Sequence, residues 1–214
     1  MKNAFVELVF ILDRSGSMRG LEADTVGGFN SMIEKQRQLE GDVLVSTVLF
    51  NQRSAVLHDR VDIDEVSEMK VGDYEASGTT ALLDAVGRSI RHIRRIYADT
   101  LRVKRPEKVI FMITTDGMEN ASTEFSYDRL KRSIDRASEE YGWEFLFMGA
   151  NIESFAEASR MGIRQDRAAH YRADSSGTRT NFKAMNRAMD DLRTSREINA
   201  NWKEDIEDDY RNKK

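Results

Sequence analysis

The sequence contains no cysteine, a single proline and only three histidines in 214 residues. Without cysteine the chain can form neither disulfide bonds nor thiolate metal sites, a composition compatible with a reducing compartment. The three histidines have no mutual spacing typical of a transition-metal site. These absences favour oxygen ligands for any metal ion that the chain binds.

The chain also lacks an excess of positive charge and a long apolar run. Its formal net charge is −4 and its pI is about 5.6, which gives little electrostatic support for binding nucleic acid or an anionic membrane. No stretch approaches the roughly 20 apolar residues of a membrane span. Glu7 interrupts the apolar N-terminal segment, and no small-residue cleavage site follows it. We expect a cytoplasmic protein that binds neither nucleic acid nor membrane.

Short apolar runs alternate with segments of helical periodicity along most of the chain. Runs rich in Val, Ile, Leu and Phe predict strands at 5–12, 43–50, 108–114 and 143–149. A further strand at 53–58 follows the second run after only Asn51-Gln52, which predicts a hairpin. Such a hairpin would make one edge of the sheet antiparallel.

Apolar residues at steps of three or four predict helices between these strands, at 20–39, 81–97, 128–141 and 155–161. Alternating strands and helices are typical of βαβ units. The expected fold is therefore α/β, with a doubly wound, mostly parallel central sheet, one antiparallel edge strand and helices on both faces.

The last forty residues follow a different pattern. An apolar stripe from Phe182 to Leu192 predicts a docked C-terminal helix within 179–202, preceded by a loop at 175–177. Residues 203–214 are nearly all charged and have little to bury, which predicts a disordered tail.

The most informative stretch is the apolar run at 8–12, which ends at Asp13 and is followed by Ser15 and Ser17. In open α/β sheets, ligands bind at the carboxyl ends of such buried strands. A second buried run at 109–113 ends in the same way and is followed by Asp116. The two carboxylates are therefore expected at the same edge of the sheet.

Between these segments, Thr79 and Thr80 precede the helix predicted at 81–97. One of these hydroxyls could bind a cation or cap the helix. Carboxylates and hydroxyls together are hard oxygen ligands that suit Mg²⁺, Mn²⁺ or Ca²⁺, and five protein groups would leave a coordination position open. The sequence predicts a divalent-metal site with these ligands: Asp13, Ser15, Ser17, a threonine and Asp116.

The three segments, Asp13-x-Ser15-x-Ser17, Gly78-Thr79-Thr80-Ala81-Leu82 and Thr115-Asp116-Gly117, resemble the metal-ion-dependent adhesion site of von Willebrand factor A domains. The resemblance covers roughly residues 4–165 and is greatest to compact bacterial members, because Phe147-Met148-Gly149-Ala150-Asn151 closes another strand. In the family pattern the threonine ligand stands two residues before the helix leucine, here Leu82, which favours Thr80 over Thr79.

The resemblance implies a metal-binding domain over 1–178 that carries Mg²⁺, or Mn²⁺ or Ca²⁺, and binds protein partners that donate an acidic side chain to the metal. Partners typical of the family include AAA+ ATPases and stress- or phage-associated proteins. One departure is Arg14, a bulky cation between two expected ligands. An outward-pointing Arg14 side chain would lie at the rim of the site.

Three classes of function remain open from the sequence. A binding module is favoured over an enzyme because the motif segments contain no histidine, and the chain has neither a Gly-x-Ser-x-Gly elbow nor a phosphate loop. The alternative is a Mg²⁺-dependent phosphoryl-transfer or hydrolytic enzyme that uses the strand-end aspartates. The third is a structural subunit whose metal site is vestigial.

Overall fold

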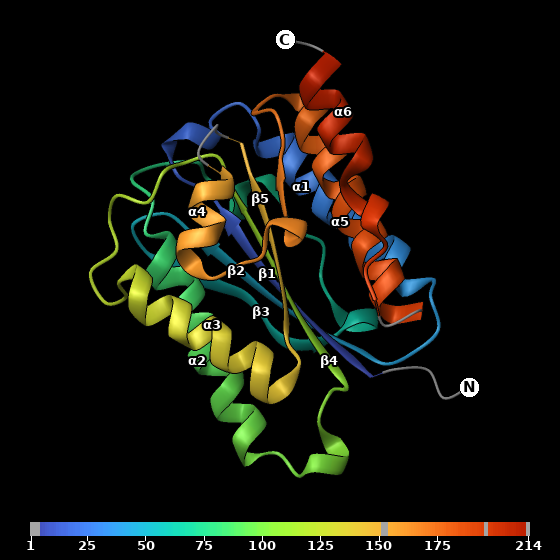
Figure 1. The fold of residues 1–214 in the computed structure, drawn as a ribbon. Helices are drawn as coiled ribbons and strands as arrows, with labels where there is room; N and C mark the ends of the chain where they lie inside the picture. The colour runs from blue at the N-terminus through green and yellow to red at the C-terminus, as the bar shows by residue number, and fades with distance from the viewer. Residues whose placement is uncertain (1–4, 151–153, 195–196, 213–214) are drawn as a thin grey trace.

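The computed structural model describes residues 5–150, 154–194 and 197–212, and its centre is a six-stranded sheet with the order β3-β2-β1-β4-β5-β6 (Figure 1). The strands are β1 Val6–Asp13, β2 Val43–Phe50, β3 Ser54–Asp62, β4 Lys108–Thr115, β5 Glu144–Gly149 and β6 Ala168–His170. All neighbouring pairs are parallel except β2 and β3, which form an antiparallel hairpin at one edge. This arrangement confirms the predicted fold class. The short strand β6 was not predicted, because three residues are too few for a period-two pattern.

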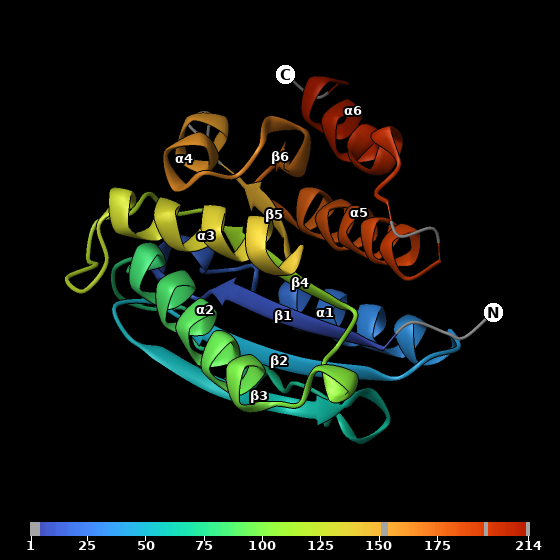
Figure 2. The same cartoon turned by 60° about the horizontal axis from the view of Figure 1, so that its bottom comes forward.

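Helices cover both faces of the sheet (Figure 2). Their bounds are α1 Glu22–Arg37, α2 Leu82–Asp99, α3 Tyr127–Tyr141, α4 Ser154–Met161, α5 Ser175–Thr194 and α6 Glu204–Asn212. The periodicity explains most of these helices, and local signals end some of them. Helix α3 begins after Ser126, whose hydroxyl accepts a hydrogen bond from the amide of Arg129, and ends at Gly142 in the left-handed conformation.

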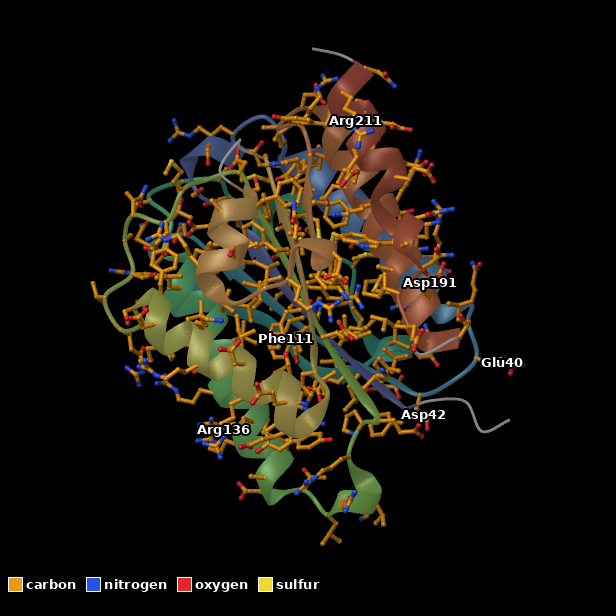
Figure 3. The ribbon with its side chains drawn as sticks, in the orientation of Figure 1. Glu40, Asp42, Phe111, Arg136, Asp191 and Arg211 are labelled. Carbon is orange, nitrogen blue, oxygen red and sulfur yellow. The ribbon has the colours of Figure 1, made fainter. Side chains whose placement is uncertain are left out.

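Side chains of β1 alternate between two hydrophobic cores. Leu8, Phe10 and Leu12 pack with α1 and α5 on one face, whereas Val9 and Ile11 pack with α2 and α3 on the other. Figure 3 shows the contrast between interior and surface, with Phe111 inside the molecule and Arg136 and Arg211 on its outside. Helices thus pack on both faces of the sheet, and loops surround the carboxyl ends of its strands.

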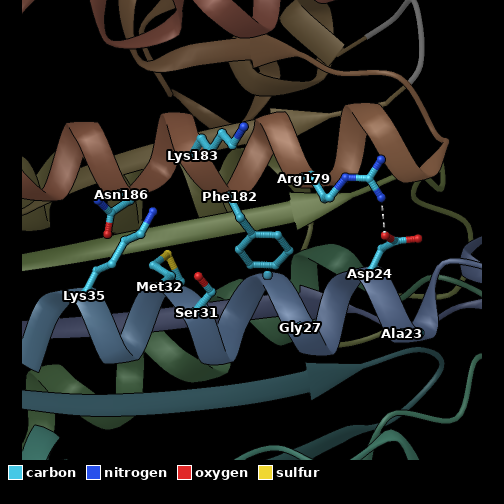
Figure 4. Close-up of a pocket in the computed structure, with 11 residues that line it drawn as sticks. Ala23, Asp24, Gly27, Ser31, Met32, Lys35, Arg179, Phe182, Lys183 and Asn186 are labelled. Atoms are coloured by element: carbon cyan, nitrogen blue, oxygen red, sulfur yellow. Dashed lines mark hydrogen bonds and ion pairs between the residues drawn. The ribbon is translucent and has the colours of Figure 1, made fainter.

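Helix α5 lies along α1. The ring of Phe182 points at α1, and the guanidinium of Arg179 pairs with the carboxylate of Asp24 at 2.8 Å (Figure 4). The residues predicted as a loop at 175–177 form the first turn of this helix, because Asp174 accepts a hydrogen bond from the amide of Gly177 at 2.8 Å. An aspartate just before the first helical residues is a common N-terminal cap.

The disorder predicted for the charged tail is wrong over Glu204–Asn212, which forms α6. Ile206 and the preceding Trp202 are buried, and the indole of Trp202 donates a hydrogen bond to the carbonyl of Asp166 at 2.9 Å. Polar and ring contacts add to these two buried side chains: Lys203 donates to the carbonyl of Ala168 at 2.8 Å, and the ring of Tyr210 stacks on that of His170. Asn151 and residues 213–214 lie outside the described part of the chain. None of the described helices is long and apolar enough to cross a membrane.

Candidate metal centre

Two carboxylates meet at the carboxyl edge of the sheet. Strands β1 and β4 are parallel neighbours with Leu12 opposite Thr114, so Asp13 at the end of β1 and Asp116 just beyond β4 lie at the same edge. The pairing of these two strands brings the carboxylates together, although they are separated by about one hundred residues in the sequence.

Asp13 is fully buried and held by two short hydrogen bonds. Its Oδ1 accepts from the amide of Ser15 at 2.6 Å, and its Oδ2 accepts from the hydroxyl of Thr115 at 2.6 Å. The hydroxyl of Tyr74 donates to the backbone carbonyl of Asp13. Burial raises the pKa of Asp13 above its ordinary value, although the hydrogen bonds oppose the shift.

The serine hydroxyls connect the two carboxylates. Ser15 Oγ lies 3.0 Å from Ser17 Oγ, and the hydroxyl of Ser17 donates to Asp116. Burial raises the pKa of Asp116 to about 6, and the negative charge of Asp13 adds to the shift. Asp13, Ser15, Ser17 and Asp116 thus form one continuous group of oxygen atoms.

Thr80 lies beside this group, whereas Thr79 faces solvent. A Cβ atom placed on Gly117 would come within 2.5 Å of Thr80 Oγ1 and 3.2 Å of Ser15 Oγ, so both hydroxyls approach the backbone of Gly117. Thr80 is 3% exposed, whereas Thr79 is exposed and its amide donates to the side chain of Gln52. The structure therefore places Thr80 with the other predicted ligands.

Backbone hydrogen bonds fix the loops that carry these hydroxyls. The amide of Gly16 donates to the carbonyl of Gly78 at 3.0 Å, and the amide of Ser77 donates to the carbonyl of Arg14 at 2.9 Å. Gly78 has φ +77°, a conformation that favours glycine. The loop containing Ser15 and the loop before α2 are therefore tied to each other, and the relative position of Ser15 and Thr80 does not depend on side-chain contacts alone.

Asn120 and Glu119 support the site, and the sequence analysis missed both. The side-chain oxygen of Asn120 accepts from the backbone amide of Thr80 at 2.9 Å, and the backbone amide of Asn120 donates to the carbonyl of Thr80 at 3.0 Å. The carboxylate of Glu119 accepts from the amide of Leu83 at 2.9 Å, at the start of α2. Their position directly after Thr115-Asp116-Gly117 was the available signal, but their partners lie on another loop.

The donor set suits a hard divalent cation. It combines three hydroxyls and two carboxylates from three segments of the chain at the carboxyl edge of the sheet, and two nearby negative charges in a partly buried setting would be offset by a dication. The part of the chain that the structure describes contains no group of three or more His, Cys, Asp or Glu side chains that could hold a metal. Any site here therefore depends on the hydroxyls as well as on the carboxylates.

No known family profile matches the sequence, and no curated protein matches it either. Solved structures do match in shape. The vWF domain of the type V pili tip protein Mfa5 from Porphyromonas gingivalis has a TM-score of 0.64 at 11% identity, covering 91% of this chain and 98% of the other.

Two further structures extend this comparison. The von Willebrand factor type A structure from Catenulispora acidiphila has a TM-score of 0.62 at 19% identity, covering 86% of this chain and 42% of that one. Manganese-loaded TRAP protein from Plasmodium vivax has a TM-score of 0.55 at 16% identity, covering 82% and 72%. The chain spans less than half the length of several matched chains. Together these similarities show that this protein has the von Willebrand factor A fold.

Proposed function

We propose that the protein is a divalent-metal-dependent binding module. Asp13, Ser15, Ser17, Thr80 and Asp116 would hold a Mg²⁺ ion that coordinates an acidic side chain of a protein partner. The metal would supply an open coordination position for a hard carboxylate oxygen, and the protein would supply the shape and charge around it.

The observation that carries this proposal is the continuous oxygen group at the sheet edge, which is buried on one side and open on the other. Asp13, Ser15 and Thr80 are buried, whereas Ser17 is exposed and Asp116 is half-buried. A cation bound by such a group would contact the buried oxygens on the side of the sheet and remain accessible to solvent on the other side. This is the arrangement that a binding function requires.

Mg²⁺ is the proposed ion, with Mn²⁺ or Ca²⁺ as alternatives, because all three accept hydroxyl and carboxylate oxygens. The manganese-loaded state of the TRAP structure supports divalent binding in this fold. The pilus tip structure supports a role in protein interaction. We propose a cytoplasmic bacterial setting, in which an AAA+ ATPase or a stress- or phage-associated protein would donate the acidic residue.

We also propose that the module is not an enzyme. The described hydrogen bonds to the carboxylates of Asp13 and Asp116 come from hydroxyl and backbone amide groups, so neither carboxylate has a described histidine or lysine partner with which to share a proton in catalysis. The alternative, Mg²⁺-dependent phosphoryl transfer or hydrolysis, predicts turnover of a phosphate ester that Asp13→Ala abolishes. Such turnover would overturn the binding proposal.

Direct metal binding is the first test. We expect calorimetric titration with Mn²⁺ or Mg²⁺ to show one site in the unaltered protein and none in Ser15→Ala with Ser17→Ala. Ser133→Ala is the matched control, because the hydrogen bond described for its hydroxyl stays within α3, to the carbonyl of Arg129. Equal binding by the double variant and the control would contradict the proposed ligands.

Partner binding is the second test. Affinity capture from the native host in Mg²⁺ and in EDTA, with the double serine variant alongside, should recover partners only in Mg²⁺ and only with the unaltered protein. Partners retained regardless of metal and of substitution would overturn the proposed mechanism and favour a structural subunit.

A further inference from the structure

Two of the most exposed large apolar side chains in the described part of the chain lie together in the loop between α2 and β4. Leu101 is 69% exposed and Val103 is 91% exposed. The loop forms a short 3-10 turn, η4 Arg102–Lys104, at the lower end of the molecule in Figure 1, beyond the end of the sheet. Exposed apolar side chains at a protruding point are typical of interaction surfaces.

The turn is ordered by its own hydrogen bonds, which leave these side chains outside. The amide of Lys104 donates to the carbonyl of Leu101 at 2.8 Å, and the Nε of Arg105 donates to the carbonyl of Thr100 at 2.8 Å. The guanidinium of Arg105 also stacks 4.7 Å above the ring of Tyr97. The backbone therefore folds back on α2, and Leu101 and Val103 remain exposed in a shaped loop.

Cations alternate with the two apolar residues along the loop, as Arg102 and Lys104, and Arg95 lies in the preceding helix α2. Arg95, Arg102 and Lys104 are exposed and form no ion pair with any described residue. Between Arg94 and Lys104 the single acidic residue is Asp99. The net charge of −4 for the whole chain therefore conceals a local basic cluster, which we call the basic tip and define as Arg95, Leu101, Arg102, Val103 and Lys104.

We propose that the basic tip binds an anionic lipid bilayer, with Leu101 and Val103 entering the interface and the three cations lying at the level of the lipid phosphates. The apolar side chains can enter the acyl-chain boundary of the bilayer, while the flanking Lys and Arg side chains pair with the anionic headgroups. The tip is convex, which suits insertion into a fluid surface, and nucleic acid would leave the aliphatic side chains without a partner. The tip and the metal centre lie at opposite ends of α2, which spans about 27 Å at 1.5 Å per residue.

The test is sedimentation of the full chain with vesicles of phosphatidylcholine mixed with phosphatidylglycerol, compared with vesicles of phosphatidylcholine alone. EDTA is present throughout, so that the metal centre cannot bridge to lipid phosphates. We expect binding to the anionic vesicles about tenfold tighter or more, weakening as salt is raised.

Two double variants separate the two contributions. Leu101→Ser with Val103→Ser and Arg102→Gln with Lys104→Gln should each weaken binding by about tenfold or more. The controls are Val71→Ser, which removes an apolar side chain that is 55% exposed elsewhere, and Arg132→Gln, which removes an exposed cation of α3. Circular dichroism checks that all variants keep the fold, as expected for substitutions of exposed side chains.

Three results would overturn the proposal. The first is equal binding to anionic and neutral vesicles, and the second is unchanged binding by either double variant. The third is retention on immobilised poly-glutamate without binding to vesicles, which would assign the basic tip to an acidic protein surface. Each can occur whether or not the metal centre binds a cation, so this test is independent of the proposed function.

Discussion

Asp116 is the residue whose ionisation should couple the metal centre to pH. Burial raises its pKa from the ordinary 3.8 to about 6. A carboxyl group whose pKa is higher in the folded than in the unfolded state stabilises the metal-free fold at a pH below the pKa of the unfolded state. This contribution is lost as the pH rises through the folded-state pKa of about 6. A bound dication needs the ionised form, so metal binding follows the opposite trend.

We therefore expect Mg²⁺ to raise the melting temperature more at pH 7.5 than at pH 5, measured by thermal unfolding in Mg²⁺ and in EDTA. Asp116→Asn removes the titrating group and should abolish the difference. An equal effect of Mg²⁺ at both pH values in the unaltered protein would show that Asp116 does not bind the ion.

Gly117 leaves room for the hydroxyls of the site. A Cβ atom there would come within 2.5 Å of Thr80 Oγ1, so Gly117→Ala should displace that hydroxyl and lower the affinity for Mn²⁺ by about tenfold or more. Calorimetric titration measures the change. Gly72→Ala is the control, because nothing lies within 4 Å of a Cβ at that position, and unchanged affinity in Gly117→Ala would argue against Thr80 as a ligand.

At the scale of elements, the contact between α1 and α5 depends on a glycine. A Cβ atom on Gly28 would lie 2.7 Å from Cγ of the Phe182 ring and closer still to the ring edge. Gly28→Ala should therefore destabilise the protein by about 1–3 kcal/mol through overpacking. The neighbouring Gly27 has nothing within 4 Å, so Gly27→Ala should be neutral or stabilise α1 by up to about 1 kcal/mol. Urea unfolding distinguishes the two, and equal effects would contradict the packing described.

Helix α6 is the element in which the structure differs most from the sequence pattern. Because Ile206 is 1% exposed, Ile206→Ala should destabilise the protein by about 2–4 kcal/mol. Asp208→Ala on the exposed side of the same helix should change stability by less than about 0.5 kcal/mol. If urea unfolding showed no effect of Ile206→Ala, the tail would be disordered as its composition predicts.

At the scale of the whole molecule, the fold and the metal centre depend on different residues. Two hydrophobic cores hold the sheet from both sides, whereas the proposed ligands lie at its carboxyl edge, at the end of β1 and in the loops beyond the strands. We expect EDTA to leave the far-ultraviolet circular dichroism unchanged, and Mg²⁺ at one hundred times its dissociation constant to add about 2.7 kcal/mol of stability. Cooperative unfolding by EDTA at room temperature would instead make the metal a structural requirement.

The two proposed surfaces occupy opposite ends of the molecule. Helix α2 begins beside Thr80 and ends shortly before Leu101, so a partner at the metal centre and a bilayer at the basic tip would not compete for space. The sequence analysis predicted no membrane contact because the net charge of −4 sums over the whole chain and does not reveal the local excess of cations at the basic tip.

The sequence by itself determined strands β1 to β5 and most helices, because burial imposes a period on neighbouring residues, and it also supplied the order of the motif segments. It predicted that Asp13 and Asp116 follow buried strands at one edge of the sheet, but it could not predict the contacts that connect them through Ser15 and Ser17. The tertiary structure decided that Thr80, which the family pattern favoured, is buried beside the other proposed ligands while Thr79 is exposed. It alone decided that β6 completes the sheet and that α6 is ordered. These outcomes depend on contacts between residues far apart in the chain, such as Asn120 with Thr80 and Trp202 with Asp166, which no local pattern records.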